Sequence, residues 1–134
     1  MLVVACFSRH EEALAWAQER LIETYGPIDL ASPDFDFHQT SYYEKTMGTG
    51  LKKRFLAFAS LRPFEELPDI KNATIALEKD LAQSGRLPEP RPLNLDPGII
   101  QLGKFFLATT KDQGHRIYLR DGIYAEITLR CTRG

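Results

Sequence analysis

The last part of the chain constrains its fold most, because apolar and polar residues alternate there in a way that defines a β-hairpin. Residues 115–130 read HRIYLRDGIYAEITLR. In a strand, successive side chains point to opposite faces, so a shift of one residue moves every side chain to the other face. The stretch therefore predicts two antiparallel strands, and their register decides which side chains share a face.

Two registers compete for this hairpin. A two-residue turn at 121–122 would pair Arg120 with Ile123 and mix apolar and charged residues on each face. A three-residue loop at 120–122 would instead pair Leu119 with Ile123. It gathers aliphatic side chains on one face: Ile117, Leu119, Ile123, Ala125, Ile127 and Leu129. It gathers polar and aromatic side chains on the other: Arg116, Tyr118, Tyr124, Glu126, Thr128 and Arg130. We predict the three-residue loop, which also sets Arg116 opposite Glu126 and His115 opposite Ile127.

Strands and helices are predicted to alternate along the rest of the chain. Residues 2–7 form a continuous apolar run, typical of a central strand. Ser8 and Glu11 have the spacing of a capping box that begins a helix. Apolar residues then recur at helical spacing up to the Gly26-Pro27 stop: Leu14, Ala17, Leu21 and Tyr25.

The middle of the chain gives a mixture of predictions. Residues 34–38 alternate as a half-exposed strand does, 40–50 suggest a loop that can contain one helical turn, and 53–61 suggest a strand. A helix is predicted over 63–84, with four apolar residues facing inward: Ile70, Ala73, Leu77 and Leu81. Asp96-Pro97-Gly98 fits a type II turn. The apolar segment 99–109 is compatible with either a strand or a helix.

This order of elements predicts an α+β fold. The expected architecture is a two-layer α/β sandwich of the ferredoxin-like split β-α-β type, with an added C-terminal β-hairpin. An open α/β sheet is the alternative. A length of 134 residues predicts a single domain over residues 1–134.

Charge and composition exclude several classes of partner. The chain has 17 basic and 18 acidic side chains, so bulk charge favours neither nucleic acid nor an anionic membrane. No apolar run reaches the length of a membrane span, and residues 1–7 lack a basic leader. Cys6 and Cys131 lie in strand-like runs and are expected to be buried, reduced thiols. We expect a cytoplasmic protein without nucleic acid or membrane partners, and the sequence is compatible with a homo-oligomer.

The polar face of the hairpin is the main candidate site. The planar guanidinium of Arg116 suits a phosphate or carboxylate, and Glu126 would orient it. Lys111 and His115 lie just upstream, and His115 is the candidate for moving protons near neutral pH. The alternative interpretation is a cross-strand ion pair beside two stacked tyrosines on a solvated sheet face.

A second candidate is a metal site on the predicted strand at 34–38. Asp34, Asp36 and His38 would share one face of that strand, and their oxygen and nitrogen atoms suit a divalent metal. No further ligand can be identified from the sequence. The alternative is a solvated edge strand with Phe35 and Phe37 buried behind it.

A third candidate is aromatic and basic. Tyr42 and Tyr43, with the basic run 52–54, would stack a base and contact a phosphate. Alternatively, the tyrosines pack a loop and the basic residues cover the surface. Nucleophilic catalysis has little support, because Cys6 lies in a buried run and the chain has no Gly-x-Ser-x-Gly elbow. There is also no P-loop motif. The sequence leaves open whether the protein is an enzyme, and it names no cofactor.

Several stretches, spread over nearly the whole chain, form a specific set: 25–29, 42–45, 47–48, 50–55, 94–98, 110–112 and 115–126. As a set they resemble a family of small bacterial proteins catalogued as a domain of unknown function. Some members are labelled GTP-binding protein, so the resemblance implies a nucleotide as one candidate ligand. It directs attention to polar positions around the hairpin: Asn94, Asp96, Lys111, His115, Arg116, Asp121, Tyr124 and Glu126.

We therefore predict a small domain that binds an anionic molecule, either a nucleotide or a phosphorylated metabolite. The predicted ligand-binding residues are Lys111, Arg116, Glu126, Tyr124, Tyr42, Tyr43, Asn94 and Asp96. The alternative is a protein-interaction or scaffolding domain without catalysis. That alternative predicts an exposed apolar patch or a paired strand edge.

Overall fold

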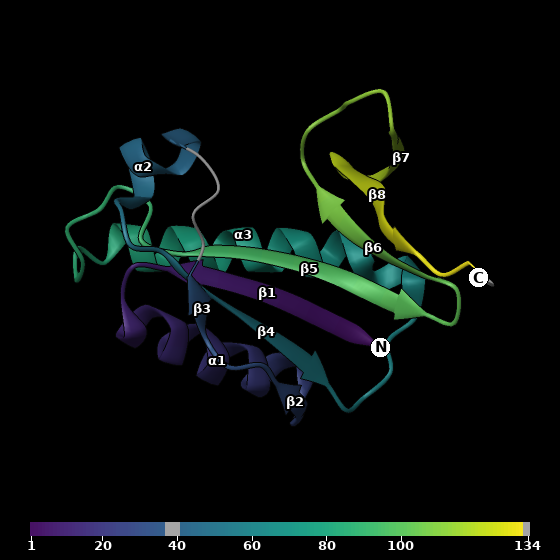
Figure 1. Cartoon of the computed structure of the whole chain (residues 1–134), viewed down its shortest axis with the longest axis horizontal. Helices are drawn as coiled ribbons and strands as arrows, with labels where there is room; N and C mark the ends of the chain where they lie inside the picture. Colours follow the sequence, from purple (N-terminus) through teal and green to yellow (C-terminus); the bar gives the residue numbers. More distant parts are fainter. Residues whose placement is uncertain (37–40, 133–134) are drawn as a thin grey trace.

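The computed structural model of the chain describes residues 1–36 and 41–132, except for the side chains of residues 41 and 42. Within this part, an eight-stranded antiparallel sheet has the order β2-β4-β1-β5-β6-β8-β7, with β3 paired to β4 (Figure 1). The strands are β1 (Leu2–Ser8), β2 (Ile28–Ala31), β3 (Phe35–Asp36), β4 (Lys52–Phe58), β5 (Asn94–Gln101), β6 (Lys104–Thr109), β7 (Arg116–Arg120) and β8 (Ile123–Arg130). The helices are α1 (Glu11–Tyr25), α2 (Ser41–Met47), the 3-10 turn η1 (Phe64–Glu66) and α3 (Leu67–Gln83). The predicted α+β class agrees with this structure.

The main core lies between the sheet and helices α1 and α3. Alternate side chains of β1, such as Val4 and Cys6, are buried together with Leu14 of α1 and Ile70 of α3. Both helices therefore cover the same face of the sheet, and burial of this apolar surface is the main source of stability. None of the described helices has the length and apolar character needed to cross a membrane.

The opposite face of the sheet is covered only in part. Phe7 of β1 points to this face and is buried with Met47 and Leu51. Its ring meets Tyr43 of α2 edge-on, with ring centroids 5.2 Å apart. The predicted loop over 40–50 therefore contains more helix than the single turn expected, because α2 has seven residues (Figure 1). Beyond α2, none of the described helices lies over this second face, and we call it the open face.

The predicted capping box at Ser8 is wrong, because β1 continues through this residue. The Ser8 hydroxyl donates to the Pro92 carbonyl oxygen at 2.6 Å and accepts from the His10 backbone N–H at 3.0 Å. Helix α1 begins three residues after Ser8, at Glu11. The Glu11 carboxylate accepts hydrogen bonds from the Arg54 guanidinium instead of capping the helix.

The predicted turn at Asp96-Pro97-Gly98 is also wrong, because all three residues lie inside β5. A Cβ on Gly98 would lie 2.6 Å from the Phe106 carbonyl oxygen and 2.7 Å from the Phe105 ring. Gly98 is therefore required for the close approach of β5 and β6. Glycine within a strand often marks a site where another part of the backbone lies very near.

The hairpin register is partly as predicted. Arg116 pairs with Glu126 and Tyr118 with Tyr124, as the alternation of residues indicated. The predicted pairing of Leu119 with Ile123 is wrong, because the ladder shifts at Leu119 and Arg120 pairs with Ile123. The turn has two residues, Asp121 (φ 53°) and Gly122 (φ 79°). Positive φ at both positions is typical of a type I′ turn, and the bulge beside it restores the apolar and polar faces. The ladder begins at Arg116, so His115 lies outside it.

The tip of this hairpin is attached to α3. The Arg120 guanidinium donates to the Asp69 carboxylate at 2.8 and 2.9 Å and to the Glu65 carbonyl oxygen at 2.7 Å. The Asn72 amide donates to the Asp121 carbonyl oxygen at 3.4 Å. These contacts hold the turn between β7 and β8 against the N-terminal half of the helix.

Strands β5 and β6 pair over only part of their length. Their ladder runs from Gly98↔Leu107 to Gln101↔Lys104, whereas residues 94–97 of β5 pair with β1 alone. Figure 1 shows β6 turning away from β5 toward the hairpin. Pro97 lies at the point of separation, where its missing N–H costs no ladder bond. The sheet is therefore split between the start of β5 and the end of β6.

Candidate functional site

The split between β5 and β6 opens into a cavity of about 490 Å³, which is in the range of small-molecule sites. Its walls come from α3, from the start of β5 with the residues before it, and from the end of β6 with the hairpin. Six of the predicted ligand-binding residues line it: Tyr43, Asn94, Asp96, Lys111, Arg116 and Glu126. Three charged residues that the sequence analysis did not include line it as well: Lys71, Glu78 and Arg91.

On the β5 wall, side chains of α3 take the place of the missing strand. The Leu95 backbone N–H donates to Glu78 Oε2 at 2.6 Å, and Lys71 Nζ donates to the Leu95 carbonyl oxygen at 3.2 Å. Buried backbone polar groups need partners, and here β6 has turned too far away to supply them. Lys71 and Glu78 of α3 therefore stabilise the split, because they bind backbone groups of β5 that a paired strand would otherwise bind.

The same wall continues as a chain of hydrogen bonds to the mouth of the cavity. Lys71 Nζ also contacts Asp96 Oδ1 at 3.4 Å, and the Asn94 amide donates to Asp96 Oδ2 at 3.0 Å. Arg91 Nη2 in turn donates to Asn94 Oδ1 at 2.8 Å. Both oxygens of Asp96 thus have partners, and the Arg91 guanidinium is held at the edge of the cavity.

The hairpin wall contains the predicted Arg116–Glu126 pair. Arg116 Nε donates to Glu126 Oε1 at 2.9 Å, and Arg116 Nη1 donates to the Lys111 carbonyl oxygen at 3.0 Å. Neither bond uses Nη2. His115 Nε2 lies 2.8 Å from the same Glu126 oxygen. Burial disfavours ionisation of Glu126, but the hydrogen bonds from Arg116 and His115 outweigh it and hold the pKa of Glu126 below its usual value.

Glu78 has the opposite shift. Burial raises its pKa above the ordinary value, although the Leu95 N–H and the charges of Lys71 and Arg91 oppose this effect. A carboxyl group with a raised pKa keeps its proton to a higher pH. The cavity that Glu78 lines also contains the basic residues Lys71, Arg91, Lys111 and Arg116.

This shift gives a prediction about pH. The unfolded chain releases the Glu78 proton at a lower pH than the folded chain, so stability falls as the pH rises from the ordinary glutamate pKa through the raised value. Glu78→Gln remains neutral and can still accept from the Leu95 N–H, so its stability should lack this fall. Urea denaturation between about pH 4 and about pH 8 measures the difference. A constant difference between the two proteins across this range would contradict the prediction.

The matched variant Glu78→Ala separates the hydrogen bond from the charge. It leaves the Leu95 N–H without its acceptor, which typically costs about 1–3 kcal/mol. We expect Glu78→Ala to be less stable than Glu78→Gln at every pH in the same series.

The other predicted site residues lie outside the cavity walls. Tyr124 meets Tyr118 edge-on with ring centroids 5.1 Å apart, and neither ring is among the lining residues. His115 reaches the site only through Glu126, and it lines a groove that faces the other side of the hairpin. Tyr42 belongs to α2, and its side chain is outside the described part.

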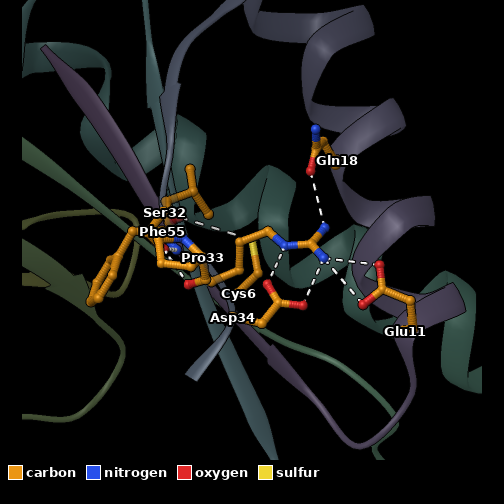
Figure 2. Close-up of polar contacts among 9 residues, drawn as sticks. Cys6, Glu11, Gln18, Ser32, Pro33, Asp34 and Phe55 are labelled. Atoms are coloured by element: carbon orange, nitrogen blue, oxygen red, sulfur yellow. Dashed lines mark hydrogen bonds and ion pairs between the residues drawn. The ribbon is translucent and has the colours of Figure 1, made fainter. Parts of the chain in front are cut away.

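The predicted metal ligands are held by cations. Asp34 accepts from Arg54 Nε at 2.6 Å and from Arg54 Nη2 at 2.9 Å, and Asp36 forms an ion pair with Lys52. Figure 2 shows Asp34, Glu11 and Gln18 around one guanidinium group, and the hydrogen bonds identify this group as that of Arg54. The hydrogen bonds from Arg54 lower the pKa of Asp34. His38 lies outside the described residues, among which no three His, Cys, Asp or Glu side chains are grouped to hold a metal.

The two cysteines differ in environment. Burial raises the pKa of the Cys6 thiol to about 12, so this group is inert as a nucleophile. Cys131 is a free thiol that is exposed, just after β8, so the prediction that it is buried is wrong. Its backbone N–H is bonded to the Gly103 carbonyl oxygen at 2.8 Å, which holds the end of β8 beside the β5–β6 turn.

A signal for the missed residues of α3 is present in the sequence. Lys71, Ile75 and Glu78 are spaced i, i+4, i+7, so they share one face of a helix. Thr74 is buried between them, whereas the predicted inward residue Ala73 is exposed. A polar stripe beside an apolar stripe on one helix is the pattern that would have indicated this wall.

Comparison with known proteins places the chain in a family. The family model described as "Domain of unknown function (DUF4416)" matches residues 1–134. The chain belongs to this family. The membership expected from the motif set is thus confirmed. No curated protein and no solved structure matches the chain. Inferences about the function of this DUF4416 domain therefore depend on its own geometry.

Proposed function

We propose that this DUF4416 domain binds an anionic small molecule in the cavity between β5 and β6. The observation that supports this most is the convergence of Arg91 with Lys111 and Arg116, from two segments far apart in sequence, around one cavity that the buried Lys71 of α3 also lines. Guanidinium and ammonium groups in a partly desolvated site form charge-assisted hydrogen bonds to phosphate or carboxylate. Because Asp96 and Glu126 are each bonded to cationic or amide donors, their charges are offset within the walls.

A nucleotide or a phosphorylated metabolite is the proposed class of ligand. The cavity volume of about 490 Å³ is sufficient for a molecule of that size. Tyr43 lines the same cavity and would contact the part of the ligand that carries no phosphate. His115 is bonded to Glu126 at the edge of the site.

We further infer that the central part of the fold is a ferredoxin-like split β-α-β unit. The order β2-β4-β1-β5, with α1 and α3 on one face, supports this inference. Strands β6, β8 and β7 then extend the sheet from the β5 edge. A free, exposed Cys131 is in keeping with a reducing compartment, so we propose a cytoplasmic location.

The binding proposal is tested by replacing Arg116. Wild type should gain thermal stability with at least one of inorganic phosphate, a nucleoside triphosphate or a sugar phosphate. Loss of a hydrogen bond to a charged group typically costs about 1.5–3 kcal/mol, so Arg116→Ala should bind about 10 to 100 times more weakly by calorimetry. Arg20→Ala is the control, since Arg20 lies on α1 and pairs with Glu23 on the exposed surface. Equal binding by Arg116→Ala and wild type would overturn the proposal.

The alternative of a protein-interaction domain is favoured by a different feature. An apolar groove of about 390 Å³ lies on the other side of the hairpin, lined by Phe64, Phe106, Ile117, Leu119 and Ile127 among others. Ile117 and Ile127 are exposed there, at the β7 edge of the sheet. If no anion raises the melting temperature, and light scattering shows a dimer, the interaction function is favoured over the binding function.

A further inference from the structure

We propose that the ligand of the cavity is amphiphilic, with an anionic head group in the split between β5 and β6 and an apolar tail along the open face of the sheet. This inference depends on the proposed function and specifies the class of its ligand. The tail would lie in a second hollow of about 430 Å³, which we call the trough. The trough is distinct from the cavity and adjoins it.

The floor of the trough is formed by the open face of the central strands. Val3 and Ala5 of β1 lie beside Phe55 and Ala57 of β4, and the small side chains among them leave the hollow. Its sides are apolar residues from the outer strands: Leu30, Ile100, Phe105, Leu107 and Leu129. Ile100 is 45% exposed and Leu129 is 65% exposed. Contiguous exposed apolar surface of this kind marks a binding site more often than isolated apolar residues do.

The position of Leu129 depends on a bulge. The pairing of β6 with β8 shifts between Phe105 and Phe106, so that Leu129 lies opposite Phe105 and Ile127 lies opposite Phe106. Leu129 therefore lines the trough, and the prediction that it shares a face with Ile127 is wrong. The bulge completes the apolar side of the trough with a residue that regular alternation would have placed on the other face.

The cavity and the trough are neighbours on the same side of β5 and share two lining residues. Asp96 and Leu107 line both of them. Along β5, Asn94 and Asp96 in the cavity and Ile100 in the trough are separated by even numbers of residues, so their side chains share one face. A bound molecule can therefore pass from charged to apolar surroundings without leaving this face.

The distribution of charge favours one orientation of an amphiphile. Arg91, Lys111 and Arg116 lie on the cavity side, whereas the trough floor is aliphatic and aromatic. At the margin of the trough, Lys53 lies over the Phe55 ring at 5.2 Å and over the Phe7 ring at 5.8 Å. Its charge is thus engaged by aromatic rings beside α2, and the cluster of guanidinium groups at the cavity is the better site for the head group.

Alkyl phosphates of increasing chain length test the proposal. Methyl, butyl and octyl phosphate present the same head group with tails of different length. If the tail is buried in the trough, each added methylene should tighten binding about fourfold by calorimetry. Equal affinity for methyl and octyl phosphate would overturn the proposal that the tail lies in the trough, and it would leave the proposed anion site intact. Failure of all three to bind would overturn the anion site itself.

Variants of the trough provide the second arm of the test. Ile100→Asp introduces a charge beside the tail, and Ala57→Leu fills the floor from a position that faces the open side. Both should weaken octyl phosphate binding by about tenfold or more and leave methyl phosphate binding unchanged. The control is Leu102→Asp, at a fully exposed residue in the turn between β5 and β6.

Two control comparisons would contradict the proposed positions of the tail and the head group. An effect of Leu102→Asp equal to that of Ile100→Asp would show that the octyl chain adsorbs to apolar surface in general. Octyl trimethylammonium, which has the same tail and a cationic head, should bind much more weakly than octyl phosphate. Equal binding of the two would overturn the assignment of the head group to the cavity. Because Ile100 is partly exposed, Ile100→Asp is expected to fold, and it still tests the trough if Ala57→Leu does not fold.

Discussion

Gly98→Ala is expected to destabilise the domain by about 2–3 kcal/mol, the upper part of the range for an overpacked site. The added methyl group would lie 2.6 Å from the Phe106 carbonyl oxygen and 2.7 Å from the Phe105 ring. A side chain can rotate away, but a ladder carbonyl can move only if β6 shifts relative to β5. Because β5 is also paired with β1 in the middle of the sheet, such a shift disturbs the core.

Gly103→Ala is the matched control for this prediction. Gly103 lies in the turn between the same two strands, and a Cβ there would meet nothing within 4 Å. Its substitution should change the free energy of unfolding by no more than about 0.5 kcal/mol. Urea denaturation of both variants decides the matter, and similar midpoints would show that β5 and β6 are not as closely spaced as described.

Arg54→Ala is expected to cost a comparable amount, about 2–3 kcal/mol. The guanidinium is mostly buried and joins β4 to two other segments. It bonds Asp34 before β3, and it bonds α1 through Glu11 at the start of the helix and Gln18 about two turns further on (Figure 2). The bidentate contact with Asp34 should supply most of the effect. Glu11 is 69% exposed, so solvent screens its contribution. Arg20→Ala again serves as the control, at an exposed pair expected to contribute less than about 0.5 kcal/mol.

The Arg54 prediction also has a pH dependence with a defined sign. Arg54 lowers the pKa of Asp34 in the folded state, so the pair stabilises the protein above the ordinary aspartate pKa. That contribution is lost as the pH falls through the lowered value. The stability difference between wild type and Arg54→Ala should therefore be largest near about pH 7 and should shrink below about pH 3. A difference that grows on acidification would contradict the assignment of Asp34 as the main partner.

The middle of the hairpin could be predicted because alternation is strong there. Ile117 and Ala125 on one face, with Arg116 and Glu126 on the other, admit only one pairing that keeps the faces separate. The turn could not be predicted in the same way. The type I′ turn at Asp121 shifts the ladder by one residue, and the bulge at Leu119 shifts it back. Two local irregularities that cancel leave no trace in the alternation of residues.

The split in the sheet was missed for a different reason. Proline followed by glycine has a strong local preference for turns, and this preference predicted a turn at 96–98 where the structure has a strand. In the folded protein the same two residues serve a contact between distant segments: Pro97 lies where β6 departs, and Gly98 where it approaches most closely. Such a role depends on the neighbouring strand, which a local pattern does not contain.

The candidate site was predicted on the hairpin side and missed on the helix side. Arg116, Glu126 and Lys111 lie close in sequence, so strand geometry alone was enough to place them together. Lys71 and Glu78 reach the same cavity only because α3 crosses behind the start of β5. The distance in sequence between α3 and the hairpin is bridged by tertiary packing, and a charged residue on a helix is usually interpreted as solvent-facing.

The contacts between the hairpin tip and α3 have a consequence for how the cavity accepts a ligand. The helix carries one wall and the hairpin carries the other, and Arg120 fastens the two together through Asp69 and the Glu65 carbonyl group. These contacts restrict the relative movement of the two walls before any molecule enters. Less of the backbone then has to be ordered when a ligand binds. Such preorganisation reduces the entropy lost on binding.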